Sequence, residues 1–205
     1  MPTQYEQEEM LERMRDILGE DFMVLKAVAY HLEEDFDTGQ AHIRCKLINI
    51  SNDNEVMNVE GSGSGLVDAC FHGLLARFAE HHPSLRSISF KDFEVKGLMS
   101  TGNEDKANAE AQVELTVLSS EQIEFPFQAQ SRSIGRASVD TTVKAVSYFV
   151  NSERAFIRIY NHLQHYRKAN RPELVTKYQL LLGQMVQNTS YTEVIEQIKN
   201  NELPT

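Results

Sequence analysis

The chain has 205 residues, of which 41% are hydrophobic and 24% charged, a composition typical of a soluble globular protein with one domain and a helical appendage. Its formal net charge of -10 excludes the concentrated basic face that nucleic acids require, and it disfavours an anionic membrane surface. The sequence has no apolar run of about 18 residues, and its acidic N-terminus lacks the basic and apolar regions of a signal peptide. We therefore expect a cytoplasmic protein.

The chain has two cysteines, Cys45 and Cys70. A disulfide between them is one interpretation, and a pair of reduced, buried thiols is the other. We favour the thiols because structural disulfides are rare in the cytoplasm.

The first part of the chain predicts a helix, three strands and a second helix. Apolar residues at helical spacing predict a helix over 4–18, which Gly19 can end. Alternating apolar residues then predict strands with short turns between them, and a glycine-rich segment leads into a helix that Pro83 stops. The predicted strands are 22–32, 41–50 and 55–60, the glycine-rich segment is 61–65, and the helix is 66–81.

The same order of elements is then repeated. Predicted strands over 86–97, 109–118 and 122–131, with a polar loop over 98–108, precede a helix over about 138–151. Three strands joined by short turns predict an antiparallel sheet, with one helix packed on each sheet. The expected fold is therefore α+β, with two βββα units and a C-terminal helical extension.

The predicted domain organisation follows this pattern. We expect an N-terminal helix over 1–20 and a two-unit domain over 21–152, with the units at 21–82 and 84–152. Residues 153–205 form the helical extension, in which Pro172 opens a helix at its first position and Tyr191 to Ile198 form a short last helix.

Two stretches 72 residues apart are similar, Ser62–Cys70 and Ile134–Thr142. At this offset Gly63 aligns with Gly135 and Asp68 with Asp140. Each stretch lies between a predicted strand and a predicted helix, where glycine allows close approach and free N–H groups attract an anion. The glycines either form such an anion site or only connect the elements.

The aligned carboxylates also allow two interpretations. In the first helical turn, an aspartate caps the helix and complements its dipole. With the nearby N–H donors, the same carboxylate instead accepts the ammonium group of a zwitterion such as an amino acid. We expect no metal or cofactor, because His162 and His165 have no third ligand nearby, and we find no nucleophile with a base at a known spacing.

These residues resemble a known family. The motif Gly-x-Gly-x-Val-Asp-Ala at 63–69, a loop with Gly102 and Asp105, and Gly135-Arg136-Ala137-Ser138-Val139-Asp140 leading to Ala145, Tyr148 and Asn151 are similar to the C-terminal regulatory (dimerisation) domain of 2-isopropylmalate synthase and citramalate synthase. The resemblance covers about residues 22–152. It implies two pseudo-symmetric βββα units, a homodimer, and a site for leucine or isoleucine as feedback inhibitor.

The resemblance also implies the residues of that amino-acid site. They are Gly63, Gly65, Leu66, Val67 and Asp68 in the first unit, and Gly135, Ala137, Ser138 and Asp140 in the second. The family's metal-dependent catalytic barrel, with its His-x-His pair, is absent from this sequence, so we expect no enzyme activity. Arg136 adds a positive charge beside the implied site, and residues 153–200 have no counterpart in the resemblance.

Two functions are therefore expected. The first is a stand-alone, dimeric regulatory domain that binds a branched-chain amino acid or a similar small carboxylate and acts on a separate synthase. The second is a protein-interaction scaffold that kept the fold and lost the ligand site.

Overall fold

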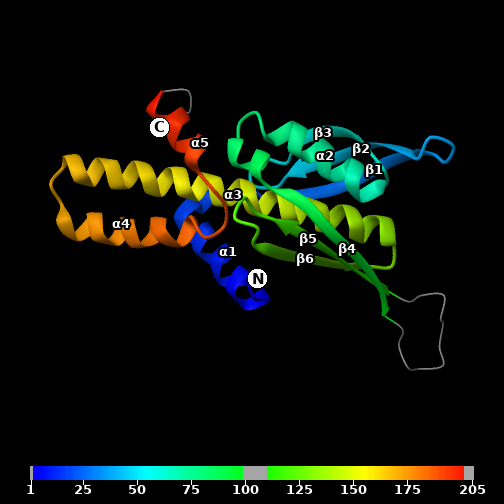
Figure 1. Ribbon diagram of the computed structural model, residues 1–205, viewed down its shortest axis with the longest axis horizontal. Helices are drawn as coiled ribbons and strands as arrows, with labels where there is room; N and C mark the ends of the chain where they lie inside the picture. Colours follow the sequence, from blue (N-terminus) through cyan, green and yellow to red (C-terminus); the bar gives the residue numbers. More distant parts are fainter. Residues whose placement is uncertain (1, 99–109, 201–205) are drawn as a thin grey trace.

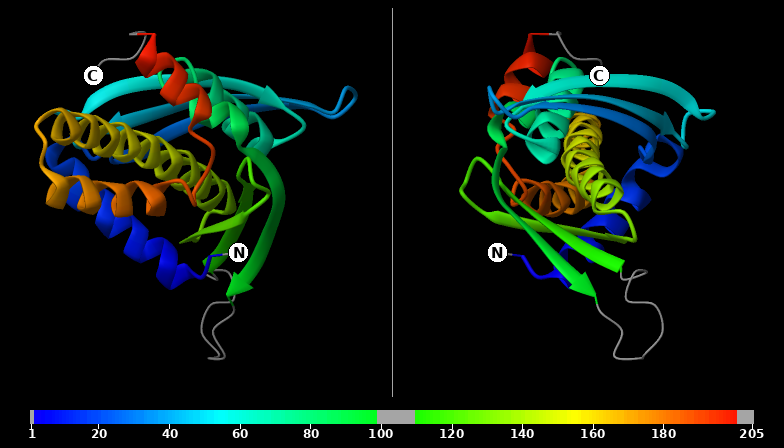
Figure 2. Two further views of the ribbon diagram at one scale, coloured as in Figure 1. Left: turned by 60° about the vertical axis from the view of Figure 1, so that its left-hand side comes forward. Right: turned by 90° about the vertical axis from the view of Figure 1, so that its right-hand side faces the viewer.

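The computed structural model describes residues 2–98 and 110–200. Two three-stranded antiparallel sheets enclose two helices (Figures 1 and 2). The first sheet contains β1 (Leu25–Asp35), β2 (Gln40–Asn49) and β3 (Glu55–Gly63), and the second contains β4 (Ser89–Leu98), β5 (Glu110–Leu118) and β6 (Glu124–Ser131). Helix α2 (Leu66–Phe78) follows the first sheet, and α3 (Ile134–Lys168) follows the second. The α+β class and the two βββα units are confirmed. Gly102, Asp105 and most of the loop predicted over 98–108 lie outside the described residues.

In the central strand of each sheet, buried and more exposed side chains alternate, as expected of a strand with one buried face. Along β2 and β5, every second side chain is buried against the helices between the sheets, and the residues between them are more exposed. The buried rows are Ala41, Ile43, Cys45 and Leu47 in β2, and Ala111, Val113, Leu115 and Val117 in β5.

The first strand of each unit carries a β-bulge near its start. The register with the central strand slips between Ala27 and Ala29 in β1, and between Phe90 and Asp92 in β4. Val28 and Lys91 are therefore the extra residues, at matching places in the two units. A bulge redirects side chains and often lies next to a binding site.

The glycine-rich segment is partly strand, because β3 continues to Gly63. Gly61 lies so close to Gly73 of α2 that a Cβ atom on Gly61 would be 2.7 Å from the Gly73 nitrogen. These two glycines therefore allow α2 to pack directly on β3.

Helix α3 is longer than predicted. The helix expected over 138–151 and the apolar stripe expected beyond 153 belong to one continuous helix of 35 residues, so the predicted division at residue 152 falls inside it. The polar residues Asn151, Ser152 and Glu153, in the middle of α3, are all buried. They remain helical because each finds a partner in a distant part of the chain.

Those partners tie three segments to the middle of α3. The Asn151 side chain accepts a hydrogen bond from the Met23 nitrogen at 2.8 Å and donates one to the Met23 carbonyl oxygen at 2.9 Å. Ser152 shares a 2.5 Å hydrogen bond with the Tyr191 hydroxyl. The Glu153 carboxylate lies 3.1 Å from His82 Nδ1 and accepts a hydrogen bond from the Ser84 nitrogen at 2.8 Å.

His82 lies after the end of α2, which stops at Phe78, and before a 3-10 turn, η2 (Pro83–Ser87). Its Nδ1 contacts the buried Glu153 carboxylate.

The N-terminal helix α1 (Gln4–Leu18) agrees with its prediction. Thr3 and Glu6 form a capping box at its start, and Gly19 ends it with φ of 55° before the short turn η1 (Gly19–Asp21). The Arg158 guanidinium of α3 donates to the carbonyl oxygens of Ile17 and Leu18 at 3.1 and 2.9 Å. Helix α1 is thereby fixed across α3.

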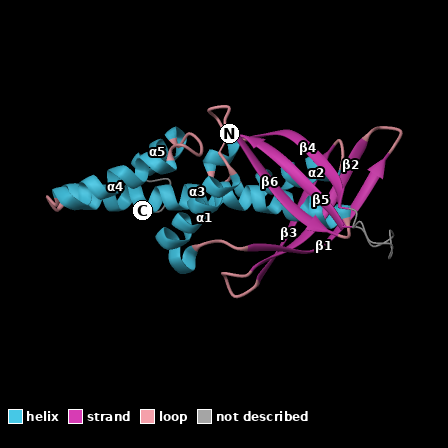
Figure 3. Cartoon of the chain, turned by 90° about the horizontal axis from the view of Figure 1, so that it is seen from below, coloured by secondary structure: helices cyan, strands magenta, loops and turns pink. Residues whose placement is uncertain are grey.

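The second half of α3 and α4 (Pro172–Met185) form a helical hairpin that extends away from the strands (Figure 3). Pro172 occupies the start of α4, as predicted. Helix α5 (Thr192–Lys199) ends the described chain and confirms the expected short last helix. Within the described residues, no helix is both long and apolar enough to cross a bilayer.

Candidate functional site

At the first strand–helix junction, the Asp68 carboxylate folds back onto its own loop. It accepts hydrogen bonds from the Ser64 nitrogen at 2.9 Å and from the Ser64 hydroxyl at 3.2 Å, and its other oxygen lies 3.5 Å from His72 Nδ1. A Cβ atom on Gly63 would lie 2.7 Å from the Ala69 nitrogen, so glycine allows close packing there. Asp68 therefore lies in the first turn of α2, where its charge complements the helix dipole, and its hydrogen bonds go to the loop before the helix.

The second junction differs from its prediction. Helix α3 begins at Ile134, with Ser133 as N-cap accepting a hydrogen bond from the Arg136 nitrogen at 3.2 Å. Gly135 is therefore a helical residue, not part of a turn before the helix. Asp140 was expected in the first helical turn, but it lies beyond that turn. Its carboxylate pairs with Arg136 Nε at 3.4 Å on the same helix.

These helix starts change the alignment of the repeat. The helices begin at Leu66 and Ile134, which are 68 residues apart and not 72. The 72-residue echo therefore places the second motif one helical turn too far along. Counted from the two helix starts, Arg136 is the counterpart of Asp68, so the same position in the two junctions carries opposite charges.

The other expected site residues differ in exposure. Ala137 and Ser138 are buried, and the Ser138 hydroxyl donates to the Ile134 carbonyl oxygen at 2.8 Å. Leu66 and Val67 are half-buried. Gly65 is extended, with φ of 171° and no atom within 4 Å of a Cβ position, so its backbone does not require glycine.

The two junctions meet at Tyr30 of β1. The Tyr30 hydroxyl lies directly against Gly135, where a Cβ atom would collide with it, and the Leu66 side chain would be 3.7 Å from the same Cβ. The structure thus brings Leu66 and Gly135 together.

Beside this contact, a cleft of about 530 Å³ follows the bulge of β1. Its charged residues are Lys26 from β1 and the pair Arg136 and Asp140 from α3. Its apolar walls come from the bulge, from β2 and from α3, namely Ala27, Val28, Ile48 and Val139. Groups of both charges and aliphatic side chains therefore line one cleft.

Sequence reasoning missed Lys26 and Tyr30, because the strand carrying them was identified only as part of the first sheet. A bulge has no unambiguous sequence signal. Arg136 was noted for its charge and now lies in the cleft, next to Asp140.

Cys45 lies behind this region on β2 and is a free, buried thiol, as is Cys70. Burial first, and the Asp140 carboxylate second, raise the pKa of Cys45 to about 11. Burial, with a smaller contribution from Cys45, raises the pKa of Cys70 further. The prediction of reduced, buried thiols is confirmed, and both are protonated at neutral pH.

The described part of the chain contains no group of three or more side chains able to hold a metal ion. His162, one of the two histidines weighed as ligands, stacks on the ring of Tyr178 with 5.2 Å between ring centres. His165 packs edge-on against Tyr166.

Comparison with known families matches residues 5–167 to the LeuA allosteric (dimerisation) domain. The match extends beyond the 22–152 of the resemblance, so residues 153–167 of α3 have a counterpart after all. It includes only this regulatory domain, and no catalytic domain is identified. No curated protein matches the sequence closely enough to count as a relative. Because the family match spans most of the sequence, the chain belongs to the LeuA allosteric (dimerisation) domain family.

Proposed function

We propose that this chain is a dimeric regulatory domain that binds a branched-chain amino acid in the cleft beside the β1 bulge. The observation that supports this proposal is the combination of groups in that cleft. Asp140 would accept the ammonium group, and Lys26 and Arg136 would bind the carboxylate, in place of the 3.4 Å contact between Arg136 and Asp140. Ala27, Val28, Ile48 and Val139 would contact an aliphatic side chain.

The cleft is chemically suited to a zwitterion. It contains two cationic side chains and one carboxylate, so a ligand that carries both charges can pair with groups of both signs. A ligand with an ammonium and a carboxylate group attached to one carbon, and with an aliphatic side chain, can pair with Asp140, Lys26 and Arg136 at once. Leucine, isoleucine and valine have this composition.

Isothermal titration of leucine, isoleucine and valine into the purified chain tests the proposal. We expect saturable binding of at least one of them, weakened about tenfold or more in Asp140→Asn, since a charge-assisted contact contributes about 1.5–3 kcal/mol. Lys26→Gln should also weaken binding. Lys91→Gln, at the bulge of β4, is its control and should leave binding unchanged. No binding of any of the three amino acids overturns the proposal.

The two aspartates can be separated in the same experiment. Asp68 belongs to the site that the resemblance implies, but its carboxylate accepts two hydrogen bonds from Ser64. We expect Asp68→Asn to weaken binding less than Asp140→Asn. The reverse order would move the site to the first junction.

Dimerisation is the second part of the proposal, and the family of the domain supports it. Sedimentation equilibrium with and without the bound amino acid tests it. We expect a dimer in both cases, and a monomer at all concentrations would contradict it. Regulation of a separate synthase is tested by adding the chain and the amino acid to that enzyme.

The protein-interaction scaffold remains the second candidate, favoured by α4. Leu180 on this helix is 67% exposed and Val186, its C-cap residue, is 46% exposed, and only Met185 of α4 is buried. If no amino acid binds, the hairpin of α3 and α4 becomes the first surface to test for a protein partner.

A further inference from the structure

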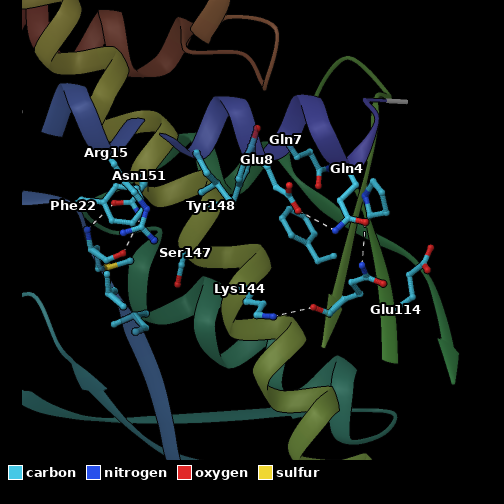
Figure 4. Close-up of a pocket in the computed structure, with 17 residues that line it drawn as sticks. Gln4, Gln7, Glu8, Arg15, Phe22, Glu114, Lys144, Ser147, Tyr148 and Asn151 are labelled. Carbon is cyan, nitrogen blue, oxygen red and sulfur yellow. Dashed lines mark hydrogen bonds between the residues drawn. The ribbon is translucent and has the colours of Figure 1, made fainter. Parts of the chain in front are cut away.

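A second cleft lies between α1, α3 and the second sheet (Figure 4). Its volume is about 620 Å³, within the range of sites for small molecules. It shares no residue with the cleft at the β1 bulge. Much of its wall is apolar, including Leu11, Phe22, Met23, Leu25, Pro126 and Phe127.

Two polar atoms in this wall are buried without a hydrogen-bond partner. They are Gln7 Nε2 on α1 and Ser147 Oγ on α3, and Gln7 as a whole is only 7% exposed. In Figure 4, Gln7 projects from α1 and Ser147 from α3 among the residues that line the cleft. A buried polar group that lacks a partner costs about 1–3 kcal/mol. A ligand with an acceptor oxygen would remove part of this cost.

The cleft also has two cations that form no ion pair within the described residues. Lys144 Nζ donates to the Gln128 carbonyl oxygen at 3.0 Å, and the Arg15 guanidinium lies 4.3 Å from the centre of the Phe22 ring. This is notable in a chain with a net charge of -10. The wall also contains two carboxylates, Glu8 and Glu114, of which Glu8 accepts a hydrogen bond from the Gln4 amide at 3.0 Å.

We propose that this cleft binds a small apolar carboxylate, a molecule with an anionic head, an aliphatic or aromatic body and no ammonium group. The Gln7 amide and the Ser147 hydroxyl donate hydrogen bonds to its oxygens. Lys144 and Arg15 at the rim balance its charge, and the apolar wall contacts its body. The site is separate from the one proposed for the amino acid.

Octanoate is a suitable probe, with octylammonium as its cationic counterpart of similar shape. We expect saturable binding of octanoate by isothermal titration and no comparable binding of octylammonium. Gln7→Leu should weaken octanoate binding about tenfold or more, and should leave the unfolding midpoint of the free protein unchanged or higher, because it removes a buried polar group that has no partner.

Matched controls separate the site from general effects. Gln184 Oε1 is also buried without a partner but does not line this cleft, so Gln184→Leu should leave octanoate binding unchanged. Lys168→Met, near the end of α3, is the control for Lys144→Met, which should weaken binding. Ser147→Ala should weaken it as well.

The outcomes decide between the two sites. Octanoate that binds Asp140→Asn normally and Gln7→Leu weakly supports the proposal, provided that Gln7→Leu leaves leucine binding unchanged. No octanoate binding, equal binding of octylammonium, or equal effects of Gln7→Leu and Gln184→Leu would overturn it. Loss of leucine binding in Gln7→Leu, with normal folding, would also overturn it, because the cleft would then be the amino-acid site itself.

Discussion

Asn151 and Met23 are joined by two buried hydrogen bonds, although they lie 128 residues apart in the sequence. The asparagine amide pairs with both backbone groups of Met23, as a neighbouring strand would. This contact fixes the segment between α1 and β1 against the middle of α3. It links the N-terminal helix to the core that both βββα units share.

Asn151→Ala is therefore expected to destabilise the protein. It leaves the Met23 nitrogen and carbonyl oxygen buried without partners, and each such group costs about 1–3 kcal/mol. Urea unfolding should show a loss of about 2 kcal/mol or more. Asn161→Ala, at a half-buried asparagine of the same helix, is the control and should change stability by less than about 0.5 kcal/mol. Equal effects of the two variants would contradict the assigned role of Asn151.

The buried carboxylate of Glu153 gives a second prediction. His82→Ala removes one of its two partners and leaves the carboxylate buried with only the Ser84 nitrogen. A buried polar group that loses a hydrogen-bond partner costs about 1–3 kcal/mol. Adding Glu153→Gln should recover part of this loss, because a neutral amide can still accept the hydrogen bond from Ser84. A double-mutant cycle by urea unfolding checks the coupling, and additive effects would show that the pair does not interact.

The elements of the fold could be predicted because each has a buried face whose period is visible in the sequence. The alternation along β2 and β5 and the capping residues of α1 are local signals. The length of α3 could not be predicted in this way. Asn151, Ser152 and Glu153 look like a solvent-exposed helix end, and only distant partners such as Met23 and Tyr191 make them suitable for the interior.

The candidate site was only partly predictable for a similar reason. Matching glycines and aspartates suggested symmetric junctions, but residue identity does not determine where a helix begins, and the two helices start 68 residues apart. Gly135 and Asp140 were named as site residues without their geometry, and their part in ligand binding stays a prediction. Their contacts with Tyr30 and Arg136 depend on how the first sheet packs on α3, which one sequence does not reveal.

The contact between Gly135 and Tyr30 gives a third prediction. Replacing glycine by alanine inside a helix normally stabilises the helix by about 1 kcal/mol. In Gly135→Ala the new methyl group would collide with the Tyr30 hydroxyl, so we expect a lower thermal midpoint. Gly183→Ala in α4, where nothing lies within 4 Å of the Cβ position, should instead raise the midpoint. Adding Tyr30→Ala to Gly135→Ala should remove the clash, and a Gly135→Ala variant as stable as Gly183→Ala would refute it.

The two buried cysteines predict a loss of stability at alkaline pH. Their folded pKa values are raised, that of Cys45 from 9.0 to about 11, so the folded protein keeps its protons at a pH where the unfolded chain releases them. The stabilisation is complete below pH 9.0 and declines as the pH rises toward about 11, by up to about 1.4 kcal/mol per pH unit for each thiol. Burial also raises the pKa of Tyr148 and of Tyr191, and these groups act in the same direction at higher pH. Urea unfolding between pH 8 and pH 10.5 should therefore give a falling free energy, with a smaller slope in Cys45→Ala. The slope is the quantity to compare, because the smaller side chain also lowers stability at every pH. An unchanged slope would mean that the Cys45 thiol ionises as easily in the folded protein as in the unfolded chain.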